Sequence, residues 1–140
     1  MNGQQRVLAA YDGSPAARRA LARAADVTAP GGMLNVINVM PEPGVSARLV
    51  PPAELYEQAV LLEDAGRQLA ARGVRVRTIA AVGNPASEIL AAAERESVDI
   101  IVIARRSGHA SHLLGSVSSH VVRSAHCDVL VVHDRDPGPS

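Results

Sequence analysis

The chain has 140 residues, a formal net charge of zero and a hydrophobic share of 47%, while aromatic residues make up only 1%. This length fits one domain with an aliphatic core, and neither the charge nor the two tyrosines favour binding to nucleic acid. Because all 14 basic residues are arginine and only one residue is cysteine, the composition excludes lysine-dependent mechanisms and an internal disulfide.

Apolar runs and helical patterns alternate along the sequence. Continuous apolar runs are typical of buried strands, and apolar residues that recur every three or four positions are typical of helices. In chain order we predict strand 6–11, helix 15–28, strand 33–40, helix 53–72, strand 75–82, helix 85–96, strand 99–104, helix 116–124 and strand 128–133.

Three of these helices have recognisable starts. Ser14 is typical of an N-cap and Pro15 of a first helical position, and the Asn84-Pro85 pair repeats this pattern. Gly115 precedes the last helix. The longest predicted helix is expected to bury one apolar side, formed by Leu55, Ala59, Leu62 and Leu69.

Two segments lack such patterns. Residues 41–52 are rich in proline, which predicts a mobile connection, and residues 135–140 predict a disordered tail after a single domain over residues 1–134. No apolar run is long enough for a membrane span or a signal peptide, so we expect a cytoplasmic protein without a membrane partner.

The alternation indicates an α/β fold, with a parallel sheet covered by helices on both faces. Ligands of such sheets bind at the carboxyl ends of the strands. This rule points to residues 12–14, after the first strand, and to the loop that follows the fourth strand. In that loop the helix start at 116–117 offers backbone amides to an anion, while Arg105 and Arg106 either grip a phosphate or are solvated.

Four stretches of the chain resemble the universal stress protein family, in the same order and over nearly the whole sequence. They are VLAAYDGSPAARRAL (7–21), GNPASEIL (83–90), DIIVIARRS (99–107) and LLGSVSSHVVRSAHCDVLVV (113–132). The resemblance implies a five-stranded parallel sheet of order 3-2-1-4-5, with a nucleotide cleft between the first and fourth strands. It also implies a homodimer in which the last strand, residues 128–133, pairs with its copy.

The loop after the fourth strand departs from the pattern G-x2-G-x9-G-[S/T] that the ATP-binding members share. Gly115-Ser116 matches the final pair, but Ala104 stands in place of the first glycine. Ser107 stands in place of the second, unless the two-residue shortening lies elsewhere and Gly108 takes that place. The resemblance therefore implies weakened binding of ATP or AMP.

The expected site combines these positions. Asp12 is either a hydrogen-bond acceptor for the ribose or a cap on the turn into the first helix. The nucleotide-binding residues that we expect are Asp12, Val36, Ala104, Arg106, Ser107, Gly115, Ser116 and Val117. No catalytic residue is expected, and no metal apart from a magnesium ion that accompanies the nucleotide.

Other site types fit the sequence less well. A receiver domain needs a second acidic residue beside Asp12 and a late lysine, but Tyr11 stands beside Asp12 and the chain has no lysine. A flavodoxin needs a first loop rich in serine, threonine and glycine and aromatic side chains that enclose the flavin, and the sequence offers neither. His109, His112 and His120 do not have a zinc-site spacing. Cys127 is expected to be a small buried apolar residue.

Three functions follow from these observations. The first is a stress-response protein that binds an adenine nucleotide weakly, through backbone contacts. The second is a homodimeric interaction protein that binds no nucleotide, and the third is a slow nucleotide hydrolase. Because no nucleophile–base pair and no pair of carboxylates can be argued from the chain, we expect a binding protein and not an enzyme.

Overall fold

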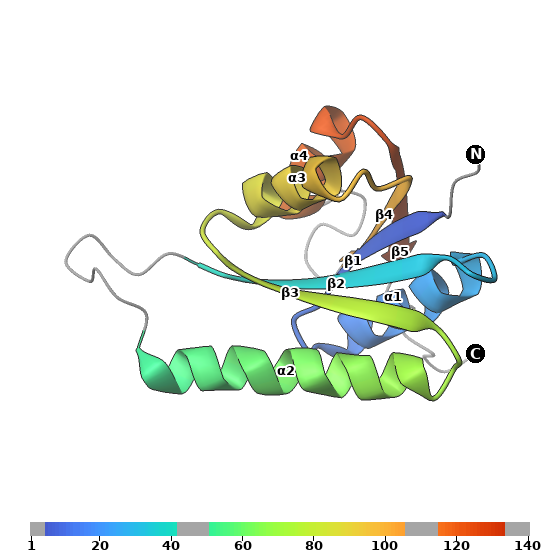
Figure 1. The fold of residues 1–140 in the computed structure, drawn as a ribbon. Helices are drawn as coiled ribbons and strands as arrows, with labels where there is room; N and C mark the ends of the chain where they lie inside the picture. Colours follow the sequence, from blue (N-terminus) through green and yellow to red (C-terminus); the bar gives the residue numbers. More distant parts are fainter. Residues whose placement is uncertain (1–4, 42–50, 106–114, 134–140) are drawn as a thin grey trace, which may run out of the picture.

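The computed structural model describes residues 5–41, 51–105 and 115–133, which form an α/β fold (Figure 1). Its strands are β1 (Arg6–Ala10), β2 (Met33–Met40), β3 (Arg75–Val82), β4 (Ile100–Arg105) and β5 (Asp128–His133). Its helices are α1 (Pro15–Val27), α2 (Pro52–Ala70), α3 (Pro85–Arg95) and α4 (Ser116–Ser124). Every predicted element is therefore present, and their ends differ from the prediction by at most two residues.

All five strands form one parallel sheet in the order β3-β2-β1-β4-β5, which confirms the predicted order. Ala9 of β1 is paired with Val36 on one side and with Val102 on the other, so β1 lies at the centre of the sheet. The strand order reverses between β1 and β4, and this switch point is where open α/β sheets bind ligands.

The helices form one layer on each face of the sheet (Figure 1). Helices α1 and α2 cover one face, where Leu21 and Leu69 are fully buried in the first core cluster. Helices α3 and α4 cover the other face, where Ile89 and Val121 lie in a second cluster. Each such side chain stabilises the fold by about 1.5–3 kcal/mol through burial. The buried core of the described residues is therefore built mainly of aliphatic side chains, with Tyr11 as an aromatic member of the first cluster.

The buried side of α2 differs in part from the prediction. Leu62 and Leu69 are buried as expected, but Leu55 is 47% exposed and Ala59 is also exposed. Residues 51–57 are all exposed, so the buried side of this helix begins at Gln58. The residues that α2 buries are Gln58, Leu62, Ala65 and Leu69. Gln58 thus takes a core position that the apolar pattern did not assign to it.

Two predicted segments fall wholly or mostly outside the residues that the structure describes. Most of the expected connection (42–50) and the expected tail (135–140) lie outside the described residues. None of the described helices combines the length and the apolar character that crossing a membrane requires.

Candidate functional site

The turn between β1 and α1 lies at the carboxyl edge of the sheet and is fixed by its own side chains. Asp12 Oδ1 accepts a hydrogen bond of 2.9 Å from the backbone amide of Ser14. Ser14 Oγ in turn caps α1 by accepting from the amide of Ala17 at 3.1 Å. Gly13, between them, has a φ of 83°, a conformation that only glycine adopts easily. The turn-capping contact predicted for Asp12 is thus present, and Asp12 is exposed to solvent.

The start of α4 is built differently. Its N-cap is Gly115, with φ −66° and ψ 167°, and the N-cap makes no side-chain hydrogen bond to the helix. Ser116 is exposed and Val117 is half-buried. The first amides of a helix have no partner within the helix and carry partial positive charge, so they attract anions.

The four described helix starts show how unusual this one is. Helices α1 and α3 are capped by Ser14 and Asn84, whose side chains accept from backbone amides. Helix α2 has an acidic residue, Glu54, in its first turn. Among the described helices, α4 alone begins with neither a side-chain cap nor an acidic residue in its first turn. An anion therefore meets the least competition at α4.

The other predicted site residues fall into two groups. Ala104 lies at the end of β4, opposite Val132 of β5, and its methyl group packs against the first core cluster. Val36 lies in the middle of β2 with no exposed surface, so in this structure its side chain belongs to the core. Arg106 and Ser107 lie outside the described residues, as does Gly108. The fold brings Asp12, Ala104 and the start of α4 to the same edge of the sheet.

Two buried amide side chains near this edge were not predicted. Gln58 donates to the side-chain oxygen of Asn38 at 3.0 Å, and Asn38 donates to the carbonyl oxygen of Tyr11 at 2.8 Å. Tyr11 immediately precedes Asp12. The one sequence signal for Gln58 is its position, because residues 58, 62, 65 and 69 repeat at the spacing of one helical face.

A cationic group lies where β4 and β5 end. Arg105 places a guanidinium nitrogen 3.0 Å from His133 Nδ1, and Arg19 of α1 donates to the backbone oxygen of His133 at 3.4 Å. The contact with Arg105 requires an unprotonated His133 Nδ1, because the guanidinium can only donate. Arg105 therefore contacts β5 in this structure.

The histidine cluster considered above is only partly described. His120 lies half-buried on α4, whereas His109 and His112 lie outside the described residues. Within residues 5–41, 51–105 and 115–133, no three histidine, cysteine, aspartate or glutamate side chains are placed to hold a metal ion.

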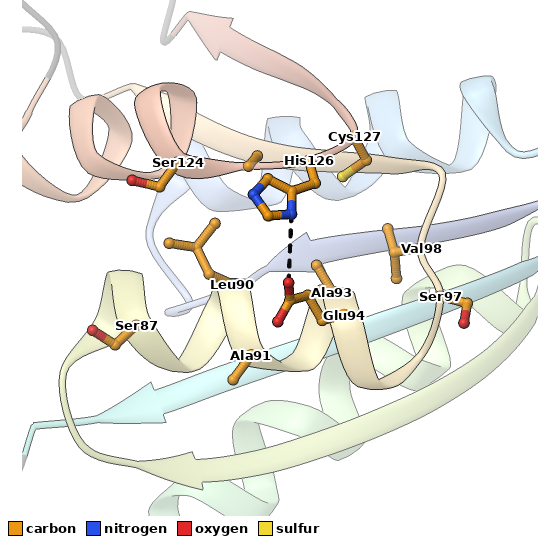
Figure 2. Close-up of a pocket in the computed structure, with 11 residues that line it drawn as sticks. Ser87, Leu90, Ala91, Ala93, Glu94, Ser97, Val98, Ser124, His126 and Cys127 are labelled. Carbon is orange, nitrogen blue, oxygen red and sulfur yellow. Dashed lines mark ion pairs between the residues drawn. The ribbon is translucent and has the colours of Figure 1, made fainter.

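A groove of about 680 Å³ lies between α3 and the end of α4 (Figure 2). This α3–α4 groove is lined by Ser87, Leu90, Ala91, Ala93, Glu94, Ser97, Val98, Ser124, Ala125, His126 and Cys127. His126 Nδ1 lies 3.5 Å from a carboxylate oxygen of Glu94, and both side chains are largely exposed. Burial raises the pKa of the Cys127 thiol, and the nearby Asp128 and Asp99 raise it further, so this half-buried residue is a poor nucleophile. Cys127 precedes β5, so it lies at the amino edge of the sheet, away from the turn that follows β1.

Comparison with known sequences gives a consistent result. Residues 4–133 match the model of the universal stress protein family. A universal stress protein of Thermus aquaticus is 40% identical over 136 residues, which cover 90% of this chain and 96% of that protein. The universal stress protein YxiE of Bacillus subtilis is 43% identical over 74 residues, and this match spans only about half of either protein, 51% of this chain and 50% of that one.

Solved structures give the same fold. A crystal structure of a universal stress protein in complex with cAMP superposes with a TM-score of 0.78 and 27% identity, covering 94% of this chain and 98% of that one.

Proposed function

The chain belongs to the universal stress protein family, and we propose that it is a stress-response protein that binds ATP or AMP at the carboxyl edge of its sheet. The phosphates bind the backbone amides of Ser116 and Val117, and Asp12 accepts a hydrogen bond from the ribose. The protein acts as a binding module without catalysis. A cytoplasmic location stays a prediction.

The start of α4 is the observation that carries this proposal. Its amides lie after β4, beside the switch point of the sheet, and Gly115 leaves the place of a capping side chain open. A Cβ atom added at Gly115 would meet no heavy atom within 4 Å among the described residues. A phosphate group can therefore take the part that Ser14 and Asn84 play in α1 and α3.

The structural relative solved with cAMP supports an adenine nucleotide as the ligand. It also disfavours the alternative of an interaction protein with an empty cleft. The affinity is expected to be low, because Ala104 stands where the ATP-binding members have the first glycine of the loop.

Variants of Gly115 test the proposal by calorimetric titration with ATP and AMP. Gly115→Asp places a carboxylate over the amides of α4, so it caps the helix, stabilises the fold by a few tenths of a kcal/mol and weakens ATP binding at least tenfold. Gly115→Asn caps the helix without charge and weakens binding less. Gly115→Ala adds only a Cβ atom and leaves binding within about twofold. Equal ATP affinities in the Asp and Ala variants would contradict a phosphate site at α4.

We further propose that the chain forms a homodimer through β5. This strand is an edge of the sheet, and Val129, Leu130 and Val131 are only partly covered. An apolar edge strand is normally covered or paired, because its outer backbone groups need hydrogen-bond partners. Antiparallel pairing of residues 128–133 with a second copy meets both needs.

Light scattering measures this association. We expect the wild type to have the mass of a dimer at micromolar concentration and Val131→Pro, which removes one backbone donor, to be monomeric or unfolded. Thr78→Pro on the opposite edge strand, β3, is the matched control and should leave any folded protein dimeric. A wild type that stays monomeric at high micromolar concentration excludes the dimer.

A further inference from the structure

A chain of buried amides joins α2 to the β1–α1 turn. Gln58 is 3% exposed, and its Nε2 lies 3.0 Å from Asn38 O, 3.0 Å from Asn38 Oδ1 and 2.9 Å from Ala81 O. A buried amide is costly unless it is hydrogen-bonded, and here three acceptors surround the donor. These acceptors come from the carboxyl-terminal halves of β2 and β3.

Asn38 passes this constraint on to β1. Because Asn38 Oδ1 faces Gln58, its Nδ2 faces the opposite way and donates to Tyr11 O at 2.8 Å. Gln58 Nε2 can only donate and Tyr11 O can only accept, so both contacts favour the same orientation of the Asn38 amide. Gln58 thus contacts the carbonyl of Tyr11 indirectly, through Asn38, and Asp12 is the residue after Tyr11.

Tyr11 is held at its other polar atoms as well. Its amide donates to Ile37 O at 2.9 Å. Its hydroxyl donates to Asp64 Oδ2 at 3.4 Å and accepts from Gln68 at 3.3 Å, and both of these residues lie on α2. Tyr11, which follows β1, is therefore held by β2 through its amide and by α2 through its hydroxyl.

The same face also limits the turn itself. A Cβ atom on Gly13 would lie 2.7 Å from Leu61 Cδ2, so α2 closes over the residue that follows Asp12. Gln58 and Leu61 are one helical turn apart, and they constrain the turn from the strand side and from the helix side.

We propose that Gln58 is a positioning residue for the nucleotide site, which acts through Asn38 and Tyr11 to fix the backbone that carries Asp12. The inference rests on the proposed function, because Asp12 is the ribose acceptor there. A leucine at position 58 would complete the apolar face of α2, so stability alone does not require glutamine. The hydrogen bonds that Gln58 makes lead through Asn38 to Tyr11, the residue before Asp12.

The test compares two buried asparagines of β2. Asn38 donates to Tyr11 O near Asp12, whereas Asn35 donates to Val7 O at 3.3 Å, near the amino end of β1. Titration calorimetry with ATP is made on Gln58→Met, Asn38→Ser and the control Asn35→Ser, and thermal unfolding is measured in each case. We expect the first two to weaken ATP binding about tenfold, which is the loss of about one hydrogen bond, and the control to stay within about twofold.

The double variant Gln58→Met/Asn38→Ser shows whether the two residues act in series. If they do, it binds ATP no more weakly than Asn38→Ser alone, because residues of one network are not additive. Two outcomes overturn the inference and leave the proposed function standing: effects that multiply, or variants that lose stability but keep the wild-type affinity. Should Gln58→Met not fold, Gln58→Leu takes its place in the same comparison.

A wild type that binds no ATP overturns the proposed function, and the backbone then tests the inference separately. Amide NMR signals of Asp12, Gly13 and Ser14 are compared in the ligand-free proteins. Shifts in Gln58→Met and Asn38→Ser that exceed those in Asn35→Ser support the positioning role. Signals that match the wild type overturn it.

Discussion

The turn after β1 and the helix start after β4 lie at the same edge of the sheet, yet they use their backbone amides in opposite ways. After β1, the amides of Ser14 and Ala17 donate to Asp12 and Ser14, so the protein satisfies its own donors. After β4, Gly115 has no side chain to do so. The first turn is therefore suited to holding a side chain in place, and the second to binding charge. In the proposed complex the ribose of the nucleotide contacts Asp12 in the turn after β1, and the phosphates contact the start of α4.

Gly13→Ala should have the largest effect on stability, because it forces a residue with a Cβ atom to adopt a φ of 83°. We expect the free energy of unfolding to fall by about 1–3 kcal/mol in urea titrations. Gly31→Ala is the control for the backbone strain, since Gly31 has a φ of 84° and open space around it, and its cost should be smaller because no clash adds to the strain.

ATP binding separates these two variants. The Cβ atom at Gly13 displaces Leu61 and moves the turn that carries Asp12, so Gly13→Ala weakens binding and Gly31→Ala does not. If both bind ATP as the wild type does, the turn after β1 takes no part in the site.

Ser14→Ala should have an intermediate effect. It removes the cap of α1 and lowers the free energy of unfolding by about 1 kcal/mol, as Asn84→Ala should for α3. Ser116→Ala should change it by only a few tenths of a kcal/mol, because Ser116 follows the N-cap of α4. A loss at Ser116 as large as that at Ser14 would show that α4 is capped by its own side chains, and the contrast between the two turns would be lost.

ATP should have no effect on the rate at which Cys127 is alkylated, which is the smallest effect that we predict. Its raised pKa, due first to burial and then to Asp128 and Asp99, keeps the thiol protonated near neutral pH, so iodoacetamide reacts slowly and faster as the pH rises. Asp128→Asn removes one negative charge and speeds the reaction. Protection of Cys127 by ATP would instead place the ligand in the α3–α4 groove.

The sequence predicts most of the fold because its signals are local. Continuous apolar runs marked the strands, and the Ser14-Pro15 and Asn84-Pro85 pairs marked two helix starts that the structure confirms. The buried side of α2 was partly wrong, because periodicity does not show where a helix reaches the sheet. Leu55 is exposed for that reason.

The residues of the candidate site also divide into those that the sequence predicts and those that it does not. Asp12 and Gly115 follow from the family motif and from the rule that ligands bind at the carboxyl ends of strands. Gln58 and Asn38 could not be predicted, because a polar residue in an apolar pattern is expected to be solvated. Only their contact in the folded chain shows that they satisfy each other.

Backbone amide NMR during a titration with ATP tests most directly whether the start of α4 binds the phosphates. We predict the largest shifts at Ser116 and Val117, and smaller ones at Ala17, whose amide already donates to Ser14. Largest shifts along the α3–α4 groove, at Leu90 or His126, would contradict this prediction.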